Sequence, residues 1–346
     1  MRGKTCWWRA AFVALISLLI AACGSSKQAS SPSPSAAASA PSTTATGGAL
    51  PPAVSELSAA EQPNVAQFPA ARGHTLQQLA SLARASAQFG AATGTFTPGV
   101  RRLAFGLNTS SGAFVYAPTV VYLARTPSSP AQGPFVAPAD PMTVAPQYRS
   151  EQNSGPGGVQ AIYESQVPVP ATGTYDVLAL TRAPSGLIGS PGELAVAPSS
   201  AIPDVGQRPP AIATDTPAST HGNLALLTTR IPAENMHATS FVQVVGKRPV
   251  ALLFSTPQLC ISKVCGPVTD IVVSLQQQFA NRITFIHEEV YADNQPSKGL
   301  RPQLKAFHLE TEPWLFTVNR NGVVSARLEG AFGVHAVSRA LQASLQ

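Results

Sequence analysis

Short hydrophobic runs, each bounded by turn residues, fill the middle of this 346-residue chain. They are rich in β-branched and aromatic residues, and Gly, Pro and Ser separate one run from the next, which is typical of strands. No long helical pattern interrupts them. We therefore expect an antiparallel β-sandwich over residues 99–198. Its expected strands lie within 101–109, 114–125, 159–170, 174–182 and 192–198.

The hydrophobic pattern changes in residues 239–346. A continuous apolar run at 249–255 is typical of a strand that is buried on both faces. Apolar residues at helical spacing over 268–275 predict a helix, and Asn321–Gly322 is a strong signal for a hairpin turn. We expect helices within 239–247, 266–281, 301–307 and 334–345, and strands within 249–255, 282–291, 313–320 and 323–330.

Composition assigns the segments outside these two regions. Residues 23–72 are rich in Ser, Pro and Ala, which predicts a flexible tether. Residues 199–238 are Pro-rich and are expected to form a linker that lies over one domain. Residues 73–98 are expected to hold a short helix. A capping box at Thr75–Gln78 begins that helix, and Gly90 can end it.

The net charge of +6 says little about partners, because half of it lies in Arg2, Lys4 and Arg9. The remaining basic residues are scattered and form no patch interleaved with aromatics, which argues against nucleic acid as a partner. Charged residues make up only 12% of the chain, whereas Pro (32) and Gly (26) are abundant. This composition favours turns and extended segments.

The N-terminal charges precede a short apolar run at 10–22, which is the arrangement of a signal peptide. The run is too short for a comfortable membrane span. Ile20-Ala21-Ala22-Cys23 resembles the lipobox of bacterial lipoproteins. The resemblance implies a lipoprotein signal peptide at 1–22 and lipid on Cys23. The mature protein would then be anchored in the cell membrane on its extracytoplasmic face. An uncleaved anchor helix is the alternative.

Two cysteines stay available under this assignment. Cys6 leaves with the signal peptide and lipid occupies Cys23, so Cys260 and Cys265 have only each other. Disulfides persist outside the cytoplasm. Residues five apart in one helix lie too far apart to bond, so we expect a loop between them and a helix that starts near Cys265. The helix N-terminus should favour thiolate at Cys265. Which cysteine attacks a partner first stays open.

Residues 239–346 resemble the thioredoxin family. Cys265-Gly266-Pro267 resembles the start of that family's Cys-Gly-Pro-Cys motif, directly after a buried strand. Residues 311–324, TEPWLFTVNRNGVV, resemble the family's strand led by a cis-proline. The resemblance implies a thioredoxin-like fold and possible thiol–disulfide oxidoreductase activity on an unknown protein partner. Pro313, if cis, would be a docking edge beside the pair. This chain departs from the family in having four residues between its cysteines instead of two.

The sandwich also carries a resemblance. Residues 170–180, PATGTYDVLAL, resemble a strand of immunoglobulin-like sandwiches, and a structural or spacing role is the simplest expectation for that domain. A lipobox, such a sandwich and a thioredoxin-like domain together resemble a group of bacterial lipoproteins. The expected fold class is therefore an all-β immunoglobulin-like sandwich followed by an α/β thioredoxin-like domain.

Two alternatives to redox exchange stay open for the cysteine pair. One is a structural disulfide that never turns over. The other is metal binding, because thiolates and imidazole suit copper(I), and Sco-like copper chaperones share the thioredoxin fold. Cys260, Cys265 and His308 are the expected ligands in that case, with His287 and His237 as further candidates. No other cofactor is expected.

Acid–base candidates are few. Asp270 is isolated in the sequence, and Glu288 and Glu289 are expected to be solvated at a strand end. No nucleophile elbow, phosphate loop or zinc-type cysteine quartet is present. Trp314 is expected to fill the core.

Overall fold

The computed structural model describes residues 56–153 and 158–346. The expected signal peptide at 1–22, the lipidation residue Cys23 and most of the tether at 23–72 lie outside the described residues. The described residues belong to one compact unit. In this part of the chain, no helix has the length and apolar character needed to cross a membrane.

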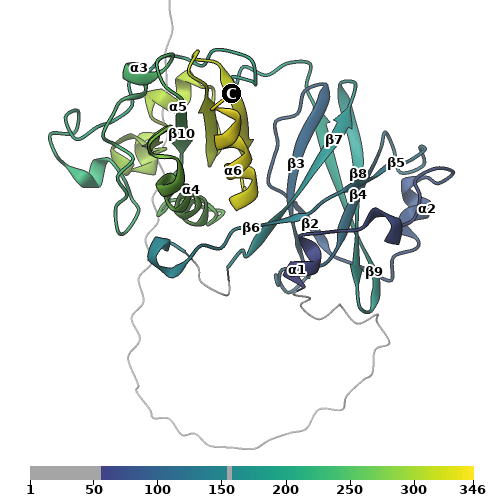
Figure 1. Cartoon of the computed structure of the whole chain (residues 1–346). Helices are drawn as coiled ribbons and strands as arrows, with labels where there is room; N and C mark the ends of the chain where they lie inside the picture. Colours follow the sequence, from purple (N-terminus) through teal and green to yellow (C-terminus); the bar gives the residue numbers. More distant parts are fainter. Residues whose placement is uncertain (1–55, 154–157) are drawn as a thin grey trace, which may run out of the picture. The chain divides into compact units, whose positions relative to one another are not determined.

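Two sheets form the all-β N-terminal part (Figure 1). Their strands are β1 (Ala85–Ser86), β2 (Gln88–Ala91), β3 (Gly99–Asn108), β4 (Thr119–Ala124), β5 (Gln132–Val136), β6 (Ala139–Pro141), β7 (Ala161–Val169), β8 (Gly173–Ala183) and β9 (Gly186–Val196). One sheet has the order β1-β9-β8-β4-β5 and the other the order β2-β3-β7-β6. Phe105, Val121, Tyr163 and Val177 from both sheets share one core cluster. The five expected strands are confirmed.

The expected helix over 73–98 is shorter than predicted. After α1 (Leu57–Ala60), helix α2 covers only Leu76–Ala80, although the expected capping box is present at its start. The chain then forms β1 and β2, so Gly90 lies in a strand and does not end a helix. Phe89 gives the physical reason, because its ring stacks on that of Phe105 with centroids 4.7 Å apart. Packing against the sandwich core overrides a weak helical preference.

The C-terminal part is built on a third sheet. It contains strands β10 (Val250–Phe254), β11 (Thr284–Glu288), β12 (Trp314–Val318) and β13 (Val324–Glu329), and helices α3 (Phe241–Val244), α4 (Cys265–Phe279), α5 (Pro302–Ala306) and α6 (Val334–Ala343). The sheet order is β11-β10-β12-β13. Strand β10 is parallel to β11 and antiparallel to β12, which is antiparallel to β13. Every helix and strand expected after residue 239 is confirmed.

Strand β10 is buried on both faces. Ala251 and Leu253 share a core cluster with residues of α4 and α6, whereas Leu252 and Phe254 pack in a second cluster with Trp314. Because successive side chains point to opposite faces, a strand covered on both sides reads as a continuous apolar run. Trp314 is fully buried, as expected for a core residue.

Residues 199–238 contain no α-helix or strand, as expected for a linker. They nevertheless supply buried side chains, since Arg230, Glu234 and His237 are each at most 8% exposed. This segment is therefore a covering layer of the third sheet as well as a connection. Short 3-10 turns complete the described structure at η1 (Val65–Gln67), η2 (Pro146–Tyr148), η4 (Leu224–Leu226), η5 (Ala292–Asn294) and η6 (Pro296–Lys298).

The sandwich contacts the third sheet through buried polar groups. The carboxylate of Asp140 on β6 accepts the backbone N–H groups of His335 and Ala336, at 2.8 and 2.7 Å, where α6 begins. These N–H groups have no partner within the helix, so an acceptor there satisfies them. Arg102 on β3 donates to the carbonyl oxygens of Glu329 and Ala331 at 3.0 and 2.8 Å.

Irregular segments cover both edges of the third sheet. At β13, the N–H of Val324 donates to the carbonyl of Gln207, and Gly206 donates back to Val324, both at 2.9 Å. At β11, the N–H of His287 donates to the carbonyl of Met236 at 2.9 Å. The backbone groups that a sheet edge usually leaves unpaired are thus partly satisfied by residues 206–236.

We expect Gly330→Ala to destabilise the protein by about 3 kcal/mol or more. Gly330 has φ +67°, and a Cβ there would overlap the carbonyl oxygen of Ala92 on the sandwich side of the junction. Gly299→Ala is the matched control, because Gly299 has φ +74° but no atom within 4 Å of the added Cβ. It should cost only about 1 kcal/mol, from backbone strain alone. Urea unfolding of both variants measures the difference, and equal losses would contradict the close approach.

Candidate functional site

The loop after β10 and the start of α4 hold the two cysteines. Cys265 is the first residue of α4, and residues 255–264 are irregular and turn structure. The expected loop and helix start are therefore confirmed. Three backbone bonds shape the loop. Leu259 and Cys260 donate to the carbonyl of Thr256 at 3.2 and 3.1 Å, and Lys263 donates to that of Cys260 at 3.3 Å.

The two sulfurs lie close together and differ in access. Both cysteines are free thiols. Their sulfurs and a carboxylate oxygen of Glu312 all lie within 4.8 Å of one another. Cys260 is 7% exposed, whereas Cys265 is fully buried. A sulfur from another molecule can therefore approach Cys260 more readily than Cys265.

The two thiols also differ in acidity. The pKa of Cys260 is lowered to about 6, chiefly by a hydrogen bond from the Cys265 thiol. Burial opposes this shift, and the Ser262 hydroxyl at 3.2 Å adds to it. Burial raises the pKa of Cys265 well above its ordinary value, and its bond to Cys260 raises it further. Cys260 is therefore the thiolate at neutral pH. The expectation of thiolate at Cys265 is wrong, because desolvation outweighs the helix N-terminus there.

Glu312 and Pro313 lie at the start of β12, beside the pair. The peptide bond between them is cis, and the carbonyl of Pro313 accepts the N–H of Gly330 at 2.8 Å. Burial raises the pKa of Glu312, and the negative charge of Cys260 raises it further. Glu312 is thus a carboxyl group suited to holding a proton next to the sulfurs. Sequence reasoning missed it, because only the fold brings it to the cysteines.

Ile261, between the two cysteines, is 91% exposed. This is the largest exposed fraction among the large hydrophobic residues that the structure describes. Single exposed apolar residues are common on protein surfaces. Here the residue follows a thiolate directly in the chain, so it offers an apolar contact to whatever molecule reaches Cys260.

His308, the expected third copper ligand, does not join the cysteines. It is exposed and borders a hollow of about 380 Å³ that Phe96 and Glu310 also line. Among the described residues, the group that contains both cysteines has Glu312 as its third member and no histidine. The other two histidine candidates, His237 and His287, lie together in a separate group.

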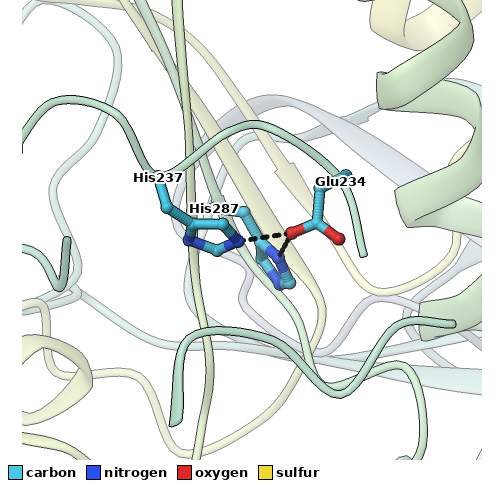
Figure 2. Close-up of side chains that lie close together, drawn as sticks. All are labelled: Glu234, His237 and His287. Atoms are coloured by element: carbon cyan, nitrogen blue, oxygen red, sulfur yellow. Dashed lines mark hydrogen bonds and ion pairs between the residues drawn. The ribbon is translucent and has the colours of Figure 1, made fainter. Parts of the chain in front are cut away.

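Glu234 holds the two rings of that group (Figure 2). Its Oε1 accepts from Nε2 of His237 and from Nδ1 of His287, both at 2.6 Å. Its Oε2 accepts from the hydroxyl of Thr228 at 3.0 Å. Nε2 of His287 donates to the carbonyl of Ser255 at 3.0 Å, so this ring carries a proton on both nitrogens. Glu234, His237 and His287 are all buried.

Mutual charge keeps Glu234 and His287 ionised despite their burial. Burial alone would raise the pKa of Glu234, but the charge of His287 and the ring hydrogen bonds hold it well below its usual range. Burial would likewise lower the pKa of His287, but the charge of Glu234 raises it to about 9. The pair is a carboxylate and an imidazolium at neutral pH.

Ser255 links this histidine group to the cysteine loop. Its carbonyl accepts from His287, and its hydroxyl donates to the carbonyl of Cys265 at 3.4 Å. The same hydroxyl bonds to that of Thr269 at 2.9 Å. The two groups are therefore connected through the residue that follows β10.

The expected solvation of Glu288 and Glu289 is wrong, since both are buried. Glu288 accepts from Arg301 at 2.9 Å, and burial raises its pKa to about 7. Asp270, isolated in the sequence, pairs with Arg230 at 3.0 Å. The partners come from distant segments, so a local pattern carries no sign of them.

Comparison with known proteins adds no relative. No family model matches this sequence, and no curated protein matches it either.

We expect Cys260 to react with iodoacetamide at a rate that rises with pH through a midpoint of about 6, because the thiolate is the nucleophile. Cys265 should stay unmodified in the folded protein, because it is buried and protonated. Mass spectrometry of peptides from the reduced full chain, alkylated over a pH series, measures both rates. Ser262→Ala should shift the midpoint upward. A wild-type midpoint near the ordinary cysteine value of about 8.5 would contradict the assignment.

Proposed function

We propose that this protein is an extracytoplasmic, membrane-anchored thioredoxin-like protein that exchanges thiols and disulfides through Cys260 and Cys265. One observation carries the proposal: two neighbouring sulfurs with opposite shifts in acidity, the pKa of Cys260 being lowered to about 6 and that of Cys265 being raised. Exchange needs a thiolate to attack and a second thiol to resolve the mixed disulfide. Cys260 and Cys265 fit these roles in that order.

The third sheet supports the thioredoxin-like assignment. Along the chain its elements are β10, α4, β11, α5, β12, β13 and α6, which is the element order on which the sequence resemblance rests. Cys260 lies in the loop after the central strand β10, Cys265 begins helix α4, and Pro313 leads the neighbouring strand β12. In the same proposal the sandwich is an immunoglobulin-like spacer, and the lipobox-like residues ending at Cys23 provide the lipid anchor.

The reductive direction begins at Cys260. Its thiolate attacks one sulfur of a partner's disulfide, forms a mixed disulfide and releases one partner thiolate. Cys265 then gives its proton to the Glu312 carboxylate and attacks the sulfur of Cys260. The bond between Cys260 and the partner breaks, and the second partner thiolate leaves. The partner is reduced by two electrons and the pair becomes a disulfide. Oxidation of a partner dithiol is the reverse.

Copper(I) binding is the second candidate. The observation that favours it is the group of Cys260, Cys265 and Glu312, whose ligand atoms lie within 4.8 Å of one another. Two thiolates suit copper(I). A carboxylate is a harder ligand than the expected His308, and this weakens the case.

We expect Cys265→Ser to trap mixed disulfides between Cys260 and its partners, because the resolving thiol is gone. Cys260→Ser is the matched control and should trap none, because the attacking thiolate is gone. Non-reducing electrophoresis and mass spectrometry of cells that express each full-length variant provide the measurement. Trapping by Cys260→Ser alone would reverse the assignment of roles.

The same variants separate the alternatives. A reduction potential of the wild-type pair above roughly −250 mV indicates a labile, exchanging disulfide, and one below about −300 mV indicates a structural disulfide. If neither variant traps a partner and the reduced wild-type chain binds copper(I) through both cysteines, the copper proposal replaces the redox proposal.

A further inference from the structure

We propose that Glu234, His237 and His287 form a binding site for a divalent transition-metal ion, with zinc as the best chemical match. Their ligand atoms all lie within 4.8 Å of one another. Glu234 and His237 are three residues apart on one irregular segment, and His287 comes from β11 (Figure 2). The site is separate from the cysteine pair and does not rest on the proposed redox function.

The donor set selects the class of metal. Two imidazole nitrogens and one carboxylate oxygen are ligands that zinc takes in proteins, with a fourth position left for water or another group. Calcium and magnesium prefer oxygen ligands alone, and copper(I) prefers thiolate or thioether sulfur. A zinc-class ion therefore fits these three side chains better than the hard or the soft cations do.

The outer contacts of Glu234 and His287 resemble those that orient metal ligands. Nε2 of His287 donates to the carbonyl of Ser255, and Oε2 of Glu234 accepts from Thr228, both at 3.0 Å. These bonds occupy the far side of each ligand and direct Nδ1 of His287 and Oε1 of Glu234 toward His237. Metal-bound histidines and carboxylates are generally held by such partners.

His237 differs from the other two side chains in its outer contacts. Its side chain is only 5% exposed, and its Nδ1 has no hydrogen-bond partner. A buried ring with an unpaired nitrogen is costly as a purely structural feature. An ion at Nε2 would leave Nδ1 without a partner as well, so the case for His237 as a ligand rests on the position of its Nε2 beside Oε1 of Glu234.

The group must open slightly to admit an ion. Ligand atoms about 2.0 Å from a tetrahedral zinc are roughly 3.3 Å apart, whereas each ring nitrogen lies 2.6 Å from Oε1 of Glu234. Glu234 and His237 belong to a segment without helix or strand, so a movement of about 0.7 Å is available there. Coordination needs Nε2 of His237 and Nδ1 of His287 without protons. The proton of the His237 ring then lies on Nδ1, and the proton on Nδ1 of His287 passes to water.

The test uses the tag-free full chain carrying Cys6→Ser, Cys23→Ser, Cys260→Ser and Cys265→Ser, so that no thiolate can bind the metal. After removal of metal with a chelator, equilibrium dialysis against zinc should give about one bound ion per chain. Adding His237→Ala should weaken zinc binding about 100-fold or more. Adding His308→Ala, an exposed histidine outside the group, should leave binding unchanged.

Cobalt(II) in place of zinc gives a spectroscopic readout. The visible absorption of a bound four-coordinate cobalt ion should appear in the thiol-free chain and vanish with His237→Ala. His237→Cys should restore binding and add a sulfur-to-cobalt charge-transfer band. This variant also decides the question if His237→Ala fails to fold.

Absence of zinc binding by the thiol-free chain, or equal binding with and without His237→Ala, would overturn the metal site. It would leave Glu234, His237 and His287 as a hydrogen-bonded ion pair. Failure of the redox proposal would not affect this result, because the tested chain has neither cysteine.

Discussion

Burial of β10 on both faces and pairing on both of its edges fix the position of everything that follows it. Phe254, its last residue, pairs with Glu288 on β11 and with Trp314 on β12. The chain that leaves β10 therefore lies between the end of β11 and the start of β12. This is why the cysteine loop, Glu312 and His287 meet there. The chemistry of the domain depends on the register of a single central strand.

Local patterns predicted the elements after residue 239 well, because apolar runs and helical spacing act over a few residues. The cysteine pair could also be predicted from the sequence, since its spacing and the following Gly266-Pro267 are local features. Which sulfur ionises depends on depth of burial, and no pattern encodes depth. Glu312 and Glu234 belong to no recognised sequence motif and acquire meaning only through contacts across the fold. The helix expected to extend to Gly90 failed for the same reason, because Phe89 packs against a distant strand.

Buried charge organises the part of the chain that has no regular structure. Residues 199–238 contain Arg230, which forms an ion pair with Asp270, and Glu234, which forms one with His287. Breaking one member of such a pair leaves an uncompensated charge away from water, which is strongly unfavourable. The segment therefore follows one path over the third sheet although its backbone makes few regular hydrogen bonds. A Pro-rich composition indicated a linker, and paired charges make that linker part of the domain.

The covered edges of the third sheet also bear on how this chain behaves among other chains. An open edge presents a row of backbone donors and acceptors on which a foreign strand can assemble. The backbone groups of Gly206 and Gln207 bond to part of that row at β13. The side chain of Arg102 donates to the carbonyls of Glu329 and Ala331 at the end of the same strand. The carbonyl of Met236 accepts from the backbone of β11. The chain thus uses its own irregular segments to discourage strand exchange and edge-to-edge aggregation between copies.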